Sequence, residues 1–231
     1  MIFENLSFLR NRIQEICDNC GRNSKEIMLV GVTKYARADQ TKEAVEAGIE
    51  HIGENRVVEA SIKFKELGGL SEKVTKHMIG HLQTNKVKKA VEVFNVIQSV
   101  DSSKLMREVE SQAGKIEKHI DVLIQVNVSA EQQKSGCTPE KVYEILDDAR
   151  NLEFANIKGL MAMAPLTDDR EAIRQCFTRL RKLKDDCDVK YKHCDNILMK
   201  YLSMGMSQDF DIAIEEGSNM IRIGGAIFKN D

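Results

Sequence analysis

The sequence predicts a single (β/α)8 TIM barrel preceded by one extra helix at the N-terminus. Eight short apolar runs of β-like composition recur along 231 residues, amphipathic helical segments separate them, and no linker or low-complexity stretch divides the chain. A doubly wound open sheet shows the same alternation, so the number of runs favours a closed barrel, which we assign to residues 1–231 as one domain. The runs span residues 28–32, 50–53, 76–80, 95–100, 119–128, 156–161, 200–205 and 220–225.

The helical segments are justified by their apolar spacing and their end signals. The extra helix is expected over roughly residues 3–20, before the first run. Residues 38–48 form a helical pattern that stops at Gly48. The segment 55–67 places four apolar side chains at helical spacing: Val57, Val58, Ile62 and Leu67.

Two later segments carry capping signals. Thr138 is positioned as an N-cap with Pro139 at the first helical position, although the acid or amide of a full capping box is missing. Residues 207–217 are expected to open a helix on Ser207 and to close it on Gly217.

Composition argues against several classes of function. Lys and Arg number 34 against 36 Asp and Glu, so the net charge of −2 provides no field that would recruit nucleic acid or an anionic membrane. The N-terminal segment is charged throughout, unlike a signal peptide, and no apolar run is long enough to span a bilayer. The densest basic cluster is interpreted as the solvated face of a helix: Lys86, Lys88 and Lys89.

The six cysteines are expected to be reduced thiols in the cytoplasm, because no export signal precedes them. Cys17 and Cys20 have the CxxC spacing of redox and zinc sites, but a second pair and a preceding strand are missing. We therefore favour a helix end that carries two cysteines, and we expect no metal site.

Polar and small residues gather where the predicted strands end. In a (β/α)8 barrel these carboxyl ends form the rim that carries ligand-binding and catalytic groups. The first run is followed by Lys34, a residue type that is rarely buried unless its charge is paired. Lys34 either escapes to solvent there or is held for its amine. The other strand ends contain 53–55, 80–83, Asp101, Asn127, Met161, Met163, 203–207 and 222–225.

The last two strand ends fit a phosphate site. Phosphate in such barrels is held by the loops after strands seven and eight, with backbone N–H groups as donors. SMGMS (203–207) supplies two hydroxyls and a glycine, and RIGG (222–225) supplies two glycines that let the backbone approach an anion. Glycines that only serve turns are the alternative, and the occurrence of both segments at the expected strands favours phosphate.

A lysine amine beside a phosphate site suggests a Schiff base with a phosphorylated carbonyl compound. A sugar phosphate, as in a class I aldolase, and pyridoxal 5′-phosphate (PLP) both fit this description. Burial of Lys34 and the nearby charge of Arg222 would leave more of the amine neutral and nucleophilic.

A series of motifs continues in order along nearly the whole chain: VGVTKY, HIGENRVVEA, HMIGHLQTNKVK, SVDS, LIQVNVS with KSG, KGLMAMAP, LSMGMSQDFDIAIEEGS and IRIGGAIF. Each motif is modest alone, but the ordered set is specific, above all IGHLQTNK together with LSMGMS. With these motifs the sequence resembles the pyridoxal phosphate homeostasis protein family, whose members are single-domain relatives of the barrel half of alanine racemases. The resemblance implies a barrel like the N-terminal domain of alanine racemase.

The resemblance also implies a PLP site. Lys34 would hold PLP as an aldimine, with Asn55 beside the ring or its linking lysine, and Arg222 would face the pyridine nitrogen. A permanently charged guanidinium favours the unprotonated nitrogen, so a carbanion would be poorly delocalised. His81 lies near the cofactor or is a hydrogen-bonded structural histidine. The residues implied to hold or flank the phosphate are Ser203, Gly224, Gly225, Ser207 and Met204.

The sequence departs from the family pattern at several positions. Ala36 stands where the family often has a second lysine, and Gly225 stands where it often has threonine, so one hydroxyl donor to the phosphate is lost. Asn219 replaces a frequent threonine, and Lys229 replaces a frequent glycine. Lys134 is either an auxiliary lysine near the site or on a transfer route, or a solvated loop lysine.

The preferred interpretation is a cytoplasmic PLP-binding protein that stores, buffers or delivers the cofactor without strong catalysis. Racemisation needs a base on each face of the substrate carbon, and the resemblance implies that alanine racemases take one, a tyrosine, from an additional domain of a partner subunit. This chain ends six residues after Gly225, and Tyr35 is poorly placed as a substitute because it neighbours Lys34.

Two alternatives stay open: a PLP-dependent amino-acid racemase or lyase of low activity, and a Schiff-base aldolase for a sugar phosphate. The expected partner is PLP, and other B6 vitamers and apo forms of PLP-dependent enzymes are considered as further partners. Neither nucleic acid nor a membrane is expected. A monomer is expected because no long exposed apolar stripe is evident.

Overall fold

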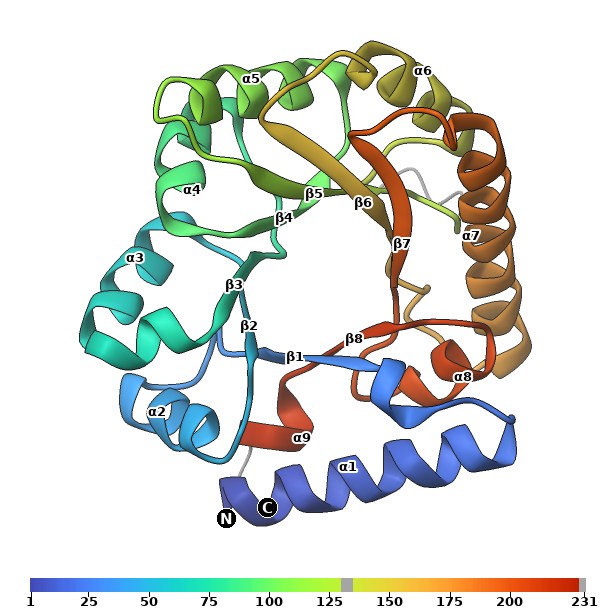
Figure 1. Cartoon of the computed structure of the whole chain (residues 1–231). Coiled ribbons are helices and arrows are strands. Elements are labelled where there is room, and N and C mark those ends of the chain that lie inside the picture. The colour runs from blue at the N-terminus through green and yellow to red at the C-terminus, as the bar shows by residue number, and fades with distance from the viewer. Residues whose placement is uncertain (130–134, 229–231) are drawn as a thin grey trace.

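Eight parallel strands close into a barrel in a computed structural model that describes residues 1–129 and 135–228 (Figure 1). Each strand pairs with the next along the chain, and β8 returns to β1 with Ile223 opposite Gly31. The prediction of a closed barrel is thereby confirmed, and the open sheet is excluded. The strands are β1 (Met28–Val32), β2 (His51–Glu54), β3 (Thr75–Met78), β4 (Val96–Val100), β5 (Ile120–Gln125), β6 (Ala155–Met161), β7 (Ile197–Ser203) and β8 (Met220–Ile223).

A ring of helices surrounds the strands (Figure 1), because each parallel connection carries the chain back over the outside of the barrel. The helices are α1 (Ile2–Asn19), α2 (Ala38–Glu46), α3 (Val57–Glu66), α4 (Val87–Val93), α5 (Ser103–Gly114), α6 (Pro139–Ala149), α7 (Arg170–Tyr191), α8 (Phe210–Glu215) and α9 (Gly225–Phe228). Short 3-10 turns are η1 (Ser24–Glu26), η2 (Gly68–Lys73) and η3 (Thr84–Lys86).

The extra N-terminal helix is part of this ring. Helix α1 packs against α2, α8 and α9 and lies beside β1 (Figure 1). Its buried side chains recur every three or four residues, which is the spacing of one helical face. They are Ile2, Leu6, Leu9, Ile13, Ile16 and Cys17.

The predicted end signals are mostly confirmed. Thr138 is the N-cap of α6 with Pro139 at its start, and Gly217 follows α8 with φ of +97°. Cys17 is buried in α1 and Cys20 is its C-cap, so the CxxC is a helix end, and all six cysteines are free thiols. Among the helices of the described residues, none has both the length and the apolarity that a membrane crossing requires.

Several predicted boundaries differ from the structure, by up to three residues. Strand β7 begins at Ile197 instead of residue 200, and α8 begins at Phe210 instead of Ser207. The second difference arises because residues 206–209 form a turn, in which the backbone N–H of Met206 donates to Oδ1 of Asp209 at 2.6 Å. The turn gives Ser207 a loop conformation.

The interior of the barrel contains a small apolar cluster and several buried polar side chains. Val30, Leu123, Met161 and Met220 form a small buried cluster whose members come from strands around the ring. Arg222 lies two residues beyond Met220 towards the carboxyl end of β8 and is also buried. The buried guanidinium of Arg222 therefore lies on the carboxyl-rim side of Met220.

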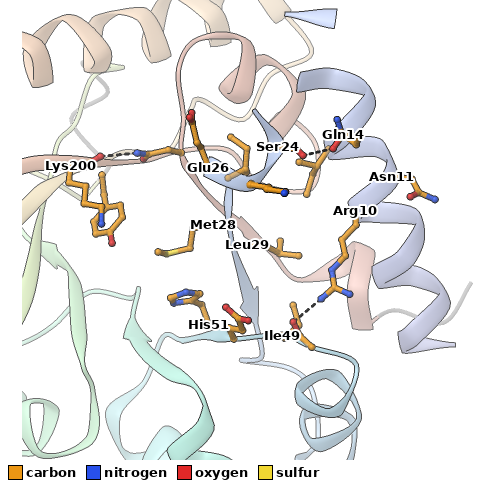
Figure 2. A pocket seen from close by; sticks show the side chains of 17 residues that line it. Arg10, Asn11, Gln14, Ser24, Glu26, Met28, Leu29, Ile49, His51 and Lys200 are labelled. Atoms are coloured by element: carbon orange, nitrogen blue, oxygen red, sulfur yellow. Dashed lines mark hydrogen bonds between the residues drawn. The ribbon is translucent and has the colours of Figure 1, made fainter. Parts of the chain in front are cut away.

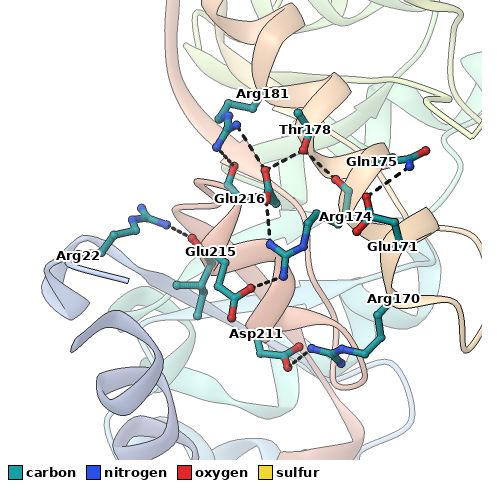
Figure 3. A network of polar contacts seen from close by, with 11 residues as sticks. Arg22, Arg170, Glu171, Arg174, Gln175, Thr178, Arg181, Asp211, Glu215 and Glu216 are labelled. Atoms are coloured by element: carbon teal, nitrogen blue, oxygen red, sulfur yellow. Dashed lines mark hydrogen bonds and ion pairs between the residues drawn. The ribbon is translucent and has the colours of Figure 1, made fainter. Parts of the chain in front are cut away.

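Helices α7 and α8 are joined by a network of polar contacts (Figure 3). Arg174 on α7 pairs with Glu216 at 2.8 Å, and the Thr178 hydroxyl donates to the same carboxylate at 2.7 Å. From the other side, Arg22 donates to the carbonyl of Ser218 at 2.7 Å. These contacts fix the segment that connects α8 to β8, and so the strand that carries Arg222.

Candidate functional site at the carboxyl rim of the barrel

Lys34 lies in a turn two residues after the end of β1, and its side chain is exposed. The turn is closed by a hydrogen bond from the backbone N–H of Ala36 to the carbonyl of Thr33 at 2.9 Å. The Lys34 ammonium lies 4.9 Å from the centre of the Tyr35 ring. The burial that we expected to make this amine more neutral is therefore absent, and Lys34 presents its amine at the rim of the barrel.

A buried ion pair supports the turn that carries Lys34. Lys63 on α3 contacts Glu54 at 2.6 Å, and the two side chains are only 13% and 2% exposed. Thr33 donates its hydroxyl to the same carboxylate oxygen at 2.7 Å, and its carbonyl accepts from Lys63. The residue that directly precedes Lys34 is thus held by both members of the ion pair.

The ends of β2 and β3 meet closely at Asn55. A Cβ on Gly80 would lie 2.3 Å from the carbonyl oxygen of Asn55, so only glycine permits this approach. Asn55 and His81 line the same small cavity of about 210 Å³. The structure therefore brings together these two predicted site residues, with His81 exposed.

Arg222 is the most completely buried charge of the predicted site. Its Nη1 donates to the Ser203 hydroxyl at 2.7 Å and its Nη2 donates to the carbonyl of Ala162 at 2.9 Å. Burial lowers the pKa of the guanidinium to about 10, partly opposed by the charge of Asp209. The group therefore remains cationic at neutral pH, while both of its side-chain hydrogen-bond partners are uncharged.

The Ser203 hydroxyl faces the barrel interior, which differs from the expectation that it holds a phosphate. It accepts from Arg222 and donates to Oε1 of Gln98 at 2.7 Å, and the residue is fully buried. Met204 is also fully buried, with its backbone N–H bonded to the carbonyl of Met220 at 3.1 Å. These two residues anchor the loop after β7, and their polar groups are already engaged.

The loop after β7 depends on Gly205. Its φ is +96°, and a Cβ there would lie 2.6 Å from the Cβ of Ala213. Burial raises the pKa of the Asp209 carboxyl, which accepts the Met206 N–H and stabilises the next turn. Ser207 lies between these two fixed points and is partly exposed, so its hydroxyl and N–H are accessible at the rim.

The end of β8 lies against the end of β1. A Cβ on Gly224 would lie 3.2 Å from the carbonyl oxygen of Val32, two residues before Lys34. Gly225 begins α9, and both glycines are partly exposed. Within residues 1–129 and 135–228, the backbone N–H groups of Ser207, Gly224 and Gly225 donate no hydrogen bond. The rim therefore offers free backbone donors at the positions predicted to bind phosphate.

The departures from the family pattern fall in different places. Ala36 is buried in the turn after β1. Asn219 precedes β8, at the end of that strand opposite to Gly224, where its side chain bonds the backbone of Leu202 at 2.8 Å. Its substitution is therefore remote from the predicted phosphate side. Lys134 and Lys229 lie outside the described residues.

Sequence reasoning missed three residues that organise the site. Gln98 and Asp209 hold Ser203 and the loop after β7, while Lys63 holds the turn of Lys34. The alternation of β4 could have assigned Gln98 to the interior, since a polar side chain on an inward position needs a partner. Nothing in the sequence indicates which partner that is.

Comparison with protein families and curated relatives places the chain among PLP-associated barrels. Residues 5–231 match the family model described as alanine racemase, N-terminal domain. The chain is 37% identical over 225 residues to the pyridoxal phosphate homeostasis protein of Aquifex aeolicus, covering 97% of this chain and 96% of the relative. It is 36% identical over 236 residues to the protein of that name from Escherichia coli, with coverage of 98% and 95%.

Solved structures show the same architecture. PipY of Synechococcus elongatus with PLP bound superposes with a TM-score of 0.86 at 32% identity, covering 99% of this chain and all of that one. An alanine racemase of Clostridium difficile superposes with a TM-score of 0.73 at 16% identity, and it shares the fold over 60% of its own length.

Proposed function

Because the chain belongs to the pyridoxal phosphate homeostasis protein family, we propose that it binds PLP at the carboxyl rim of its barrel and carries or buffers this cofactor in vitamin B6 homeostasis. The observation that carries the proposal is the rim itself. An accessible lysine amine, a buried guanidinium and three backbone N–H groups without described partners converge there from β1, β7 and β8. PipY, at 32% identity over the same length, has been solved with PLP bound.

The residues present fit this cofactor. PLP supplies an aldehyde that can bond to a lysine amine and a phosphate that needs hydrogen-bond donors. Lys34 would provide the amine, and Ser207, Gly224 and Gly225 would provide donors to the phosphate. Glycine at 205 and 224 keeps the backbone close on the side where the anion would lie, as the contacts of an added Cβ show.

Other predicted residues take supporting positions in the proposal. Asn55 and His81 would flank the cofactor from the ends of β2 and β3, and Met204 would pack beneath the loop after β7. Ser203 would act by holding Arg222, because its hydroxyl is already bonded to that guanidinium.

The guanidinium explains why we propose binding without strong catalysis. Arg222 is buried, cationic at neutral pH, and predicted to face the pyridine nitrogen. A fixed positive charge there disfavours protonation of the nitrogen, and an unprotonated ring withdraws electrons weakly. The site would hold the cofactor while giving little stabilisation to a carbanion.

Absorbance of the purified chain tests the proposal. We expect a visible band from bound PLP that survives gel filtration, and borohydride treatment followed by mass spectrometry should place a pyridoxyl adduct on peptide 28–37. Lys34→Ala should abolish both signals. Lys115→Ala, which changes an exposed lysine at the end of α5, should retain them. A wild-type chain saturated with PLP that shows no adduct on this peptide would overturn the proposal.

We propose further that residues 1–231 act as one monomeric, cytoplasmic PLP-binding unit. The single closed barrel over the described residues supports this organisation. Other B6 vitamers and apo forms of PLP-dependent enzymes are proposed as secondary partners. Light scattering of the eluting protein, with and without a recipient apo-enzyme, would measure both the monomer and any complex.

A further inference from the structure

A chain of hydrogen bonds runs through the barrel interior from Arg222 to His51. Arg222 bonds Ser203, Ser203 bonds Gln98, and Nε2 of Gln98 lies 2.9 Å from Nδ1 of His77. His77 Nε2 lies 3.1 Å from Nδ1 of His51, on β2. The five residues come from β8, β7, β4, β3 and β2, so the chain crosses the barrel and descends from the proposed cofactor site towards the opposite end.

The donors of this chain all point the same way. Ser203 accepts from the guanidinium, so its one proton goes to the Gln98 carbonyl oxygen, and the Gln98 amide nitrogen can only donate to His77. His77 then carries its proton on Nε2 and donates to His51. This assigns the His51 proton to Nε2. Among the described residues of the protein, no group accepts a hydrogen bond from that nitrogen.

Both histidines are neutral in this arrangement. Burial, together with the neighbouring His51, lowers the pKa of His77 to about 3. Burial also lowers the pKa of His51, partly opposed by Glu50. Each neutral imidazole therefore has one donor and one acceptor nitrogen. This is what the series requires, since each residue accepts from one neighbour and donates to the next.

The free end of the chain reaches a cavity at the amino-terminal end of the barrel (Figure 2). The cavity has a volume of about 890 Å³, within the range of small-molecule sites. His51 lies in its wall beside Met28, and Leu29 and Ile49 add apolar surface (Figure 2). The cavity therefore combines apolar side chains with a partly buried hydrogen-bond donor, His51 Nε2, that has no acceptor among the described residues.

The charged residues around this cavity favour an anion. Arg10 and Lys200 lie at opposite edges (Figure 2), and Arg10 is held there by a 2.7 Å bond to the Gly48 carbonyl. With Lys25 there are three cations against two acids, Glu26 and Glu50, all on exposed positions. An anion with an apolar body could pack against the apolar side chains, accept a hydrogen bond from His51 and lie near the cations Arg10 and Lys200.

We propose that this cavity is a second binding site, for a small carboxylate with an apolar body, and that His51 relays its occupancy to Arg222 through His77, Gln98 and Ser203. A carboxylate that accepts from His51 Nε2 polarises the next bond, and each bond of the chain strengthens in the same direction. The stronger pull on the Ser203 hydroxyl makes its oxygen a better acceptor for Arg222. The second site does not depend on the proposed function. Only the interpretation that a change at Arg222 affects PLP binding rests on the proposed function.

The experiment uses PLP-free protein, so that failure to bind PLP cannot mask the result. The probe is 3-methylbutanoate, followed by the side-chain nitrogen NMR signals of His51, His77 and Arg222. We expect saturable shifts at His51 that extend to His77 and Arg222 with the same midpoint. The isosteric neutral 3-methylbutanamide, and inorganic phosphate without an apolar body, should bind more weakly.

Matched variants distinguish the loss of a specific contact with the probe from a non-specific effect of substitution on the structure. His51→Phe removes the donor but keeps an aromatic ring, and should weaken the probe at least about tenfold, the scale of a hydrogen bond to a charged group. Lys200→Met should weaken it about two- to fivefold, as expected for an exposed charge. Lys104→Met changes an exposed lysine on α5 outside the cavity and should have no effect.

The outcomes decide both halves of the proposal. Absence of saturable shifts in a folded wild-type protein, or equal affinity in His51→Phe, would overturn the site. Saturation at His51 with an unmoved Arg222 signal would overturn the relay. A chain that binds the probe but fails to take up PLP would refute the proposed function and leave the cavity site standing.

Discussion

Replacement of Lys63 by methionine should destabilise the protein strongly, because it leaves the Glu54 carboxylate buried without its cation. Glu54 is 2% exposed at its side chain, and Lys63 approaches it to 2.6 Å. Methionine keeps most of the apolar stem of lysine, so the change removes charge with little loss of packing. The Thr33 hydroxyl would remain as the one side-chain donor to the carboxylate among the described contacts.

The magnitude follows from the burial of the pair. Breaking a buried ion pair by removing one partner costs about 3–5 kcal/mol, and the 13% exposure of Lys63 places this pair at the lower end, about 3 kcal/mol. For a domain of this size that corresponds to a Tm lower by about 6–12 °C. Glu54→Gln in the same chain removes the unpaired charge while keeping an acceptor for Thr33, so the double variant should recover most of the loss.

Urea unfolding followed by circular dichroism measures these free energies, and thermal unfolding gives the Tm. Lys65→Met on the same helix is the matched control, because Lys65 is exposed and should change stability by less than about 0.5 kcal/mol. PLP affinity should fall in Lys63→Met, since Thr33 directly precedes Lys34. A Lys63→Met protein as stable as the Lys65→Met control would refute the reasoning, as would a double variant less stable than Lys63→Met.

Three further perturbations have defined outcomes. The folded-state pKa of His77, about 3, lies below its unfolded value near 6.5. The contribution of the neutral imidazole to the free energy of unfolding is therefore complete above pH 6.5 and is lost as the pH falls towards 3. Unfolding free energy should drop by about 3 kcal/mol from this group between pH 7 and pH 4, and His77→Gln should flatten that part of a urea-derived stability profile. Glu216→Ala should cost about 1–2 kcal/mol in urea unfolding, because Arg174 and Thr178 lose a shared acceptor; an unchanged midpoint would contradict the network's role. Gly205→Ala should lower the Tm by several degrees through the 2.6 Å contact with Ala213 and the positive φ, whereas an unaltered Tm would show that the loop relaxes freely.

The strands were predictable because burial on both faces of a parallel barrel selects continuous apolar, β-branched runs. The first run was placed at 28–32, where β1 lies. Boundaries set by a single side-chain contact were less predictable. The start of α8 depends on the bond between the Met206 N–H and Asp209, which closes a turn where the sequence offered Ser207 as a cap.

The candidate site was also predictable only in part. Residue types at the strand ends could be assigned to the rim, since parallel strands bring all their carboxyl ends to one side. Which of them touch could not, because a hydroxyl such as that of Ser203 can face either the rim or the interior. Its partners Gln98 and Arg222 come from strands far apart in the sequence, and only closure of the barrel brings them together.

The buried guanidinium gives a physical reason for an anion at the rim. Removing a cation from water is costly unless charged partners replace the lost hydration, yet Arg222 donates its described side-chain bonds to an uncharged hydroxyl and a carbonyl. The charge of Asp209 partly opposes the effect of burial on Arg222, but burial also raises the pKa of Asp209 and so disfavours its ionised form. An anionic ligand held by the N–H groups of Ser207, Gly224 and Gly225, which donate to no described residue, would place negative charge on the same side of the barrel. Under the proposed function, the phosphate of PLP would supply the negative charge that the buried Arg222 guanidinium lacks among its described hydrogen-bond partners.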